Sequence, residues 1–280
     1  MDKEAALRKK GNLVHNLKNM GSLLVAFSGG VDSSFLLAVA HEALGQGVFA
    51  ATAASATYTE REKEDALTFT RERGIAHTLI QSEEMSLPDF VANRADRCYL
   101  CKRSLLQALF QMARDRGITH VAHGANVDDD MDYRPGARAA REMGAIAPLA
   151  EAQLGKEEIR FLSKKMGLPT WNKPAMACLA SRIPYGDLIT EKKLNMVERA
   201  EEVLADNGFT QFRVRYHGPV ARIEVDSSEI ERIIEPQLRE NLVKKFKQIG
   251  FTHIALDLEG YVTGSMNRDL IKVREKGSGK

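Results

Sequence analysis

The sequence contains no apolar run approaching the ~20 residues that a helix needs to cross a lipid bilayer. Its start, Met1-Asp2-Lys3-Glu4, is charged and no apolar core follows it, so we expect no signal peptide. Cysteine is scarce: there are three among 280 residues, an odd number set in a pattern that does not suggest a disulfide framework. These absences predict a protein without membrane partners that works in the reducing, cytoplasmic compartment.

An excess of charge of one sign is also missing. The 40 Lys and Arg residues nearly balance the 38 Asp and Glu residues, which leaves a net charge of +2, and the basic residues are spread along the chain. A large nucleic-acid surface is therefore not indicated, and we expect no stable nucleic-acid partner. With 44% hydrophobic and 28% charged residues, the composition is ordinary for a globular protein of one large or two medium domains.

The most informative stretch is Ser28-Gly29-Gly30-Val31-Asp32-Ser33. The apolar run 22–27 before it is typical of a buried parallel strand, and the run 33–44 after it is rich in helix formers. Two glycines allow the turn to adopt positive φ and approach a ligand, and Asp32 or Ser33 can cap the helix. Free N–H groups at the helix start suit a phosphate. No lysine follows the second glycine, so this is not the Walker A pattern.

Strands and helices alternate through the first half of the chain. Strands at 22–27, 48–54, 75–80 and 119–122, separated by helices, predict an α/β fold with a doubly wound, mostly parallel sheet. The polar loop 124–136 follows the fourth strand and so falls at the carboxyl edge of the sheet, where ligands bind in open α/β sheets.

The second half has a different pattern. Residues 170–189 form a long loop with Trp, Cys, Arg and Pro, which is typical of a functional segment, and we place the domain boundary within it, giving domains 1–180 and 181–280. A helix at 190–207, a hairpin within 212–225, a helix at 237–248 and a strand at 252–256 then predict a smaller α+β domain.

Several motifs together resemble one family. Its members are the ATP-dependent sulfur transferases that mature the nickel-pincer nucleotide cofactor of lactate racemase, and they share the pyrophosphate loop with other ATP pyrophosphatases of adenine nucleotide alpha hydrolase-like fold. The resemblance covers residues from about 20 to 270. It is carried by Ser28–Ser33, Gly124–Asp129, Asp132–Gly136, Cys178–Gly186, Arg213–Gly218, Asp257–Tyr261 and Thr263–Asn267.

The resemblance implies a reaction and its site. ATP would adenylate a carboxylate of pyridinium-3,5-biscarboxylic acid mononucleotide, pyrophosphate would leave, and a sulfur nucleophile from a sulfide source would displace AMP to give a thiocarboxylate. Mg²⁺ would neutralise the pyrophosphate, and arginines would hold phosphate or carboxylate groups by bidentate contacts. The family tends to form hexamers, so a homo-oligomer is expected. The implied nucleotide- and substrate-binding residues are Ser28, Gly29, Gly30, Val31, Asp32, Ser33, Gly124, Asp128, Arg134, Arg182, Arg213 and Arg215.

The cysteines decide the source of sulfur. Many members of the family have one cysteine, at the position of Cys178, and give up its sulfur. This sequence also has Cys98 and Cys101, and relatives with all three bind a 4Fe–4S cluster through them. Three thiolates hold three irons and leave the fourth open to an extra sulfide, which could attack the acyl-adenylate. The resemblance therefore makes these three cysteines the catalytic residues and the cluster ligands.

Other interpretations of the same residues stay open. A Cys-x-x-Cys pair also suits zinc, with His77, His120 or His123 as a further ligand, a redox disulfide, or inert thiols. Sacrificial donation from Cys178 needs no cluster. A tRNA-thiolating enzyme also combines this loop with cysteines, but it predicts a strongly basic face. A nucleotide-binding module would bind ATP and form neither AMP nor pyrophosphate.

Overall fold

The computed structural model describes residues 1–131, 135–174, 177–262 and 264. The chain divides into two compact units. The first comprises Met1–Phe90 and Asp96–Met176, and the second comprises Val91–Ala95 and Ala177–Lys280. Each unit has its own hydrophobic core. The domain boundary expected after residue 180 stays a prediction.

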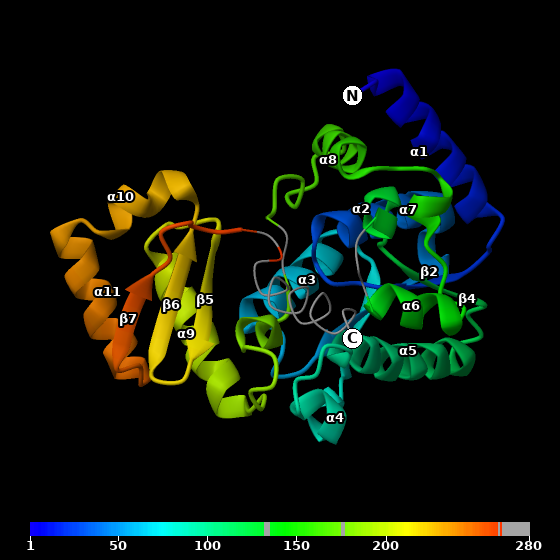
Figure 1. The fold of residues 1–280 in the computed structure, drawn as a ribbon. Helices are drawn as coiled ribbons and strands as arrows, with labels where there is room; N and C mark the ends of the chain where they lie inside the picture. Colours follow the sequence, from blue (N-terminus) through cyan, green and yellow to red (C-terminus); the bar gives the residue numbers. More distant parts are fainter. Residues whose placement is uncertain (132–134, 175–176, 263, 265–280) are drawn as a thin grey trace, which may run out of the picture. The chain divides into compact units, whose positions relative to one another are not determined.

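The first unit contains a four-stranded parallel sheet in the order β3-β2-β1-β4 (Figure 1). Its strands are β1 (Leu23–Ala26), β2 (Val48–Ala54), β3 (Ala76–Gln81) and β4 (His120–His123). The helices of the first 170 residues are α1 (Lys3–Lys18), α2 (Val31–Leu44), α3 (Glu60–Glu72), α4 (Pro88–Val91), α5 (Arg97–Asp115), α6 (Pro135–Glu142), α7 (Pro148–Glu151) and α8 (Lys156–Lys165).

Helices cover both faces of this sheet. On β1, Leu23 and Val25 point into a core built with α1, α2 and α8, whereas Leu24 between them points into a second core built with α5 and α6. Because alternate residues of a strand face opposite sides, this pattern shows that β1 is buried on both faces. The predicted doubly wound α/β fold is confirmed.

Two helices begin earlier than the sequence predicts. Helix α2 starts at Val31 with Gly30 as its N-cap, so Asp32 and Ser33 lie inside its first turn and neither caps it. The sequence also predicts a helix from about residue 102 to residue 116. In the structure this helix, α5, starts at Arg97, because the Asp96 carbonyl accepts hydrogen bonds from the N–H groups that follow it and no breaker separates them. The Cys-x-x-Cys pair is thus part of a helix.

The second unit contains a three-stranded sheet in the order β5-β6-β7, with the expected hairpin and a parallel third strand. Its elements are η4 (Leu179–Arg182), α9 (Glu191–Asp206), β5 (Phe212–His217), β6 (Val220–Val225), α10 (Ile230–Ile233), α11 (Pro236–Ile249) and β7 (His253–Leu256). One face packs its apolar residues against α9 and α11. The other face carries Arg213, Arg215 and Glu224, all buried.

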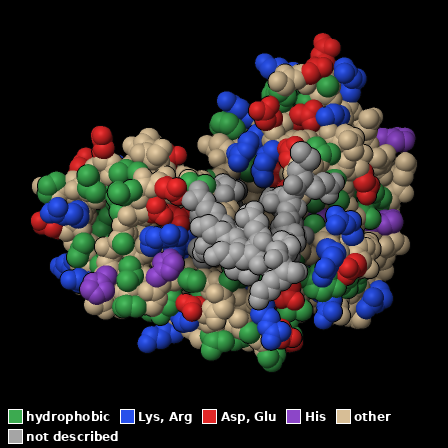
Figure 2. All heavy atoms as spheres, in the orientation of Figure 1, with side chains coloured by type: hydrophobic (Ala, Val, Ile, Leu, Met, Phe, Trp, Pro, Cys, Tyr) green, Lys and Arg blue, Asp and Glu red, His purple; other side chains and the backbone are tan. Residues whose placement is uncertain are grey.

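The surface agrees with the balanced composition. On the face drawn in Figure 2, blue Lys and Arg side chains are interspersed with red Asp and Glu side chains over both units. None of the helices in the described part of the chain combines the length and the apolar character that a bilayer crossing requires.

Candidate active site

The Ser28–Ser33 turn is held in shape by its own hydroxyl groups. The Ser33 Oγ donates its proton to the Gly30 carbonyl at 3.3 Å. Because that proton is used, the Ser33 Oγ accepts from the Ser28 Oγ at 3.0 Å, and it also accepts from the Ser28 N–H at 3.3 Å. Gly29 has φ +68°, which a side chain would strain, whereas Gly30 has φ −81°. The turn is therefore preorganised by short-range bonds and one glycine.

The start of α2 is open to an anion. Gly30 caps the helix without a side chain, so no capping side chain covers the N–H groups of the first turn. Those groups and the helix dipole place a partial positive charge there. A strand, a glycine turn and a helix start in this order form a site suited to a phosphate group.

Gly124 brings the end of β4 against this turn. A Cβ atom at Gly124 would lie 2.8 Å from the Ser33 backbone nitrogen and 3.0 Å from its Cα. Only glycine allows so close an approach of two backbone segments. The loop after β4 and the phosphate turn after β1 therefore lie together at the carboxyl edge of the sheet.

Two of the predicted carboxylates meet the start of α8. The Asp128 Oδ2 accepts the Lys156 backbone N–H at 2.7 Å, and the Lys156 Nζ lies 4.0 Å from the Asp32 Oδ2. The structure therefore gives Asp128 a capping role at α8 and joins it to the phosphate turn through Lys156. Arg134, another predicted site residue, lies outside the described residues.

A further cation at the turn was missed from the sequence. The Lys173 Nζ donates to the Gly29 carbonyl at 3.2 Å and pairs with Asp65 on α3 at 2.9 Å. The sequence did contain a signal for this lysine. Residues 170–189 are predicted to be a functional loop, and the phosphate turn itself contains no lysine or arginine. A basic residue in that loop was a natural candidate.

Cys98 and Cys101 occupy the first turn of α5, three residues apart and so on neighbouring positions of its surface. Cys98 is exposed and Cys101 half-buried, and neither forms a disulfide. Thiolates are favoured at a helix N-terminus, so this pair fits the donor set of an iron–sulfur cluster. Burial lowers the pKa of the adjacent Lys102, while the nearby Cys101 acts against that shift.

Cys178 belongs to the second unit, where it is half-buried immediately before η4. Its backbone carbonyl accepts from the Arg182 guanidinium at 2.9 Å. Within the described residues, no three His, Cys, Asp or Glu side chains are grouped as a metal site. The structure therefore places two candidate cluster ligands together in one helix and the third in the other unit.

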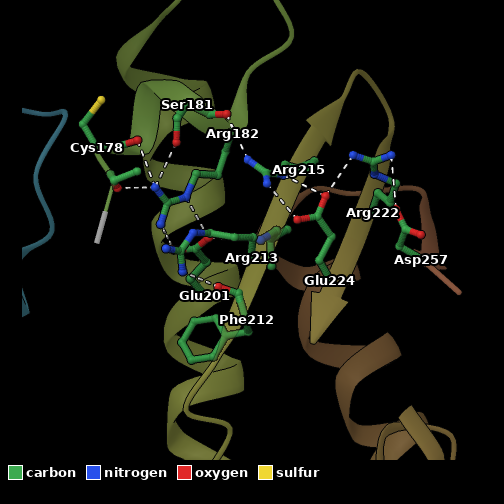
Figure 3. Close-up of polar contacts among 12 residues, drawn as sticks. Cys178, Ser181, Arg182, Glu201, Phe212, Arg213, Arg215, Arg222, Glu224 and Asp257 are labelled. Atoms are coloured by element: carbon green, nitrogen blue, oxygen red, sulfur yellow. Dashed lines mark hydrogen bonds and ion pairs between the residues drawn. The ribbon is translucent and has the colours of Figure 1, made fainter. Parts of the chain in front are cut away.

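The predicted arginines of the second unit are buried in ion pairs (Figure 3). Arg182 is 1% exposed and donates two hydrogen bonds to Glu201, both at 2.9 Å. Arg215 makes the same two-fold contact with Glu224, at 2.9 and 2.7 Å, and also donates to the Ser181 carbonyl at 3.1 Å. These bidentate contacts fix the guanidinium groups in place.

Arg213 lies beside Arg182 in this cluster (Figure 3). Burial and then the neighbouring Arg182 lower the pKa of Arg213, and the nearby Glu201 acts against that shift. Ion pairs among the described residues join Arg182 to Glu201, Arg215 and Arg222 to Glu224, and Arg222 to Asp257. Arginines gathered in this way can bind an anionic group.

Two known proteins match nearly the whole length of the chain. No protein-family model matches the chain. An uncharacterized protein of Synechocystis sp. is 44% identical over 94% of this chain and 98% of its own length. The pyridinium-3,5-bisthiocarboxylic acid mononucleotide synthase of Lactiplantibacillus plantarum is 35% identical over 95% of this chain and 96% of its own length.

A more distant similarity covers a smaller share of the chain. The glutamine-hydrolyzing GMP synthase of Aeropyrum pernix is 25% identical over 71% of this chain, which spans 43% of that enzyme. This match fits the superfamily of ATP pyrophosphatases that the Ser28–Ser33 turn indicates. Together with the near full-length match to the synthase, it confirms the predicted resemblance, and the chain belongs to the family of pyridinium-3,5-bisthiocarboxylic acid mononucleotide synthases.

Proposed function

We propose that the protein is an ATP-dependent sulfurtransferase that converts a carboxylate of pyridinium-3,5-biscarboxylic acid mononucleotide into a thiocarboxylate. The observation that carries this proposal is the 35% identity over 95% of the chain to the synthase of L. plantarum. The phosphate turn at the start of α2 supports the use of ATP, because its N–H groups suit a pyrophosphate.

Activation of the carboxylate is the first step. A carboxylate oxygen attacks the α-phosphorus of ATP, the bond between that phosphorus and the bridging oxygen breaks, and pyrophosphate leaves with the electron pair. The turn at Ser28–Ser33 would hold the β- and γ-phosphates, and Mg²⁺ carried in with ATP would offset part of their charge. We propose Asp32, which lies in the turn, as the first candidate for a residue that binds Mg²⁺.

Transfer of sulfur is the second step. Hydrosulfide attacks the carbonyl carbon of the acyl-adenylate, the bond to the adenylate oxygen breaks, and AMP leaves with the electron pair while the sulfur loses its proton. A 4Fe–4S cluster on Cys98, Cys101 and Cys178 would supply an open iron position that carries the sulfide. The chain's own contribution is two thiolates in the first turn of α5, where the helix dipole favours the deprotonated form.

Recognition of the substrate would fall to the arginine cluster of the second unit. The substrate carries a phosphate and two carboxylates, which guanidinium groups suit. Arg182 and Arg215 contact Glu201 and Glu224 in bidentate geometry, and Arg213, buried beside Arg182, is the member proposed to contact a substrate anion. The same pairs keep it rigid before the substrate arrives.

The test is a complete reaction with ATP, Mg²⁺, sulfide and the pyridinium dicarboxylate mononucleotide, under anaerobic conditions. Mass spectrometry follows the small-molecule product and the intact chain together. We expect AMP, pyrophosphate and a thiocarboxylate, with more than one product molecule per chain. Formation of no AMP in the presence of the substrate would refute the proposal.

Cysteine variants distinguish the two sources of sulfur. If a cluster carries the sulfide, C98S, C101S and C178S each lose both the iron, about four atoms per chain, and repeated turnover. If Cys178 gives up its own sulfur, only C178S is inactive, and the unchanged chain loses the mass of H₂S after one turnover. An intact chain mass with repeated turnover and no iron would contradict both routes.

We further propose that the protein works as a homo-oligomer, with a hexamer as the form that the resemblance implies. The second unit supports this, because Leu258 is 84% exposed and Ile234 is 54% exposed, and a subunit contact would cover such apolar side chains. Light scattering coupled to size-exclusion chromatography measures the assembly, and a monomer at micromolar concentration would contradict the proposal.

A further inference from the structure

The segment that carries Lys173 is held in place by α8. Arg160 donates to the Trp171 carbonyl at 2.9 Å and to the Lys173 carbonyl at 2.8 Å, so one guanidinium fixes two successive parts of the segment. Lys164, one turn further along α8, lies 4.4 Å from the centre of the Trp171 ring. These contacts with one helix fix the position of the segment, as a functional side chain requires.

The consequence of this arrangement is a cation at the phosphate turn. The Lys173 side chain is 18% exposed, and its ammonium donates to the Gly29 carbonyl and pairs with Asp65. An ammonium has three protons, and these contacts among the described residues use two of them. The third is available to a ligand in the turn.

The turn itself supplies backbone N–H groups and hydroxyls but no side-chain cation. A pyrophosphate leaving group gathers negative charge as its bond to the α-phosphorus breaks, and a turn that has no side-chain cation and carries the Asp32 carboxylate compensates that charge only in part. Walker A loops solve the same problem with a lysine inside the loop. Here the position inside the loop lacks a lysine, and a clamped segment distant in sequence brings one to Gly29.

We propose that Lys173 is a phosphate-binding residue of the ATP site, donating to the β- or γ-phosphate and to the departing pyrophosphate, with Arg160 as its positioning residue. This inference rests on the proposed use of ATP. When the nucleotide is absent, Asp65 and the Gly29 carbonyl occupy the ammonium. When it binds, the phosphate takes the third proton and competes with the half-exposed Asp65 carboxylate.

Binding measurements on the full chain test this, with inorganic pyrophosphate, α,β-methylene-ATP and AMP as probes in isothermal titration calorimetry. In K173M, we expect pyrophosphate and the ATP analogue to bind roughly tenfold to hundredfold more weakly, since a charge-assisted hydrogen bond is lost. AMP should bind as before, because it lacks the phosphates in question. K173R should retain most of the affinity, and K165M, a matched loss of a lysine at the exposed end of α8, should retain all of it.

The outcomes separate a ligand contact from a structural tether. Equal losses for AMP and the ATP analogue in K173M would show that the lysine only holds the segment, and would overturn the inference. Unchanged binding in K173M would overturn it too, while leaving the proposed function intact. If the unchanged chain binds none of the three probes, the proposed use of ATP fails first, and this inference fails with it.

A second variant keeps the test valid if K173M does not fold. D65N leaves the lysine in place and removes its competing carboxylate, so pyrophosphate should bind about two- to threefold more tightly, which is the scale of a half-exposed ion pair. Weaker binding of pyrophosphate to D65N, with AMP binding unchanged, would overturn the proposed competition.

Discussion

The two units of this chain offer different kinds of chemical group to an anion. The phosphate turn of the first unit is built from backbone N–H groups, small hydroxyls and glycines, with its lysines at the margin. The second unit buries arginines and glutamates in paired contacts, and Arg182 and Glu224 are each 1% exposed. Neutral groups in a turn cost little to bury once hydrogen-bonded, whereas buried ion pairs often stabilise a protein less than apolar residues would.

This difference indicates what each site is for. Backbone N–H groups at a helix start bind a phosphate whatever molecule carries it, so the turn recognises the phosphate group rather than a particular molecule. A rigid set of guanidinium groups specifies a shape and a charge pattern. We infer that the first unit recognises the part of ATP common to many enzymes, and that the second unit selects the substrate.

Breaking a buried pair in the second unit should have the largest effect on stability. E224Q keeps the shape of the side chain but removes the carboxylate that Arg215 and Arg222 share, while Arg222 keeps its second partner, Asp257. Removing one partner of a buried pair costs about 3–5 kcal/mol of unfolding free energy. Urea denaturation of the full chain measures it, with E229Q as the control, since the Arg232–Glu229 pair is far more exposed and should cost less than about 1 kcal/mol.

Equal losses in E224Q and E229Q would contradict the comparison, because they would mean that burial does not raise the cost of an unpaired charge. A larger loss of unfolding free energy in E224Q than in E229Q that added salt does not reduce would support the comparison. Exposed pairs weaken as salt increases, whereas buried pairs are screened much less.

In the first unit, the substitution with the largest effect should be one that separates two backbone segments. In G124A, the added Cβ would lie 2.8 Å from the Ser33 nitrogen, so the end of β4 and the phosphate turn must separate. Overpacking of this kind costs typically 1–3 kcal/mol, and we expect ATP-analogue affinity to fall with it. G11A is the matched control: a Cβ there meets nothing within 4 Å, and the exchange in the middle of α1 should add up to about 1 kcal/mol. Full nucleotide affinity in G124A would show that this contact does not shape the turn.

The sequence was informative where structure is local. The strands, the parallel sheet and the hairpin followed from short patterns, and the Thr-x-x-Glu pattern at Thr59 and Glu62 forms a capping box at the start of α3. The start of α2 was placed two residues late because Ser and Asp are common caps, whereas here Gly30 takes that position. A glycine cap cannot be distinguished from a turn glycine by residue type alone.

Contacts between distant residues could not be predicted. The sequence marks Arg182 and Arg215 as candidates, but nothing in it pairs them with Glu201 and Glu224, because those partners depend on packing of η4, α9 and the hairpin. Lys173 reaches Gly29 across 144 residues for the same reason. A resemblance supplies residue identities, whereas ion-pair partners require the fold.

A smaller effect should appear as pH dependence in the first unit. Burial, and then the nearby Lys102, lower the pKa of His123 to about 4 from an ordinary 6.5. The unfolded chain therefore binds more protons between these values, so stability is constant above pH 6.5 and falls as the pH decreases below it. At about 1.4 kcal/mol for each pH unit, the loss is about 2 kcal/mol at pH 5.

H123Q should remove this part of the pH dependence, whereas H15Q, at an exposed position of α1, should retain it. His77 and His217 also have pKa values lowered first by burial, so they add a dependence of the same sign. Urea denaturation at pH 7.5 and at pH 5 measures the difference for each variant. Identical pH dependence in H123Q and the unchanged chain would show that His123 is not buried as a neutral group.

The smallest effect concerns the helix cap near the phosphate turn. The Thr59 Oγ1 accepts the Glu62 N–H at 3.1 Å, and the Glu62 carboxylate accepts the Thr59 N–H at 3.0 Å, so two N–H groups at the start of α3 are satisfied reciprocally. T59A should cost about 1 kcal/mol, and T59S should retain most of the stability because it keeps the oxygen. Urea denaturation measures both. If T59S lost as much as T59A, the methyl group rather than the hydrogen bond would stabilise this helix, and the first unit would depend on apolar packing where we infer hydrogen bonds.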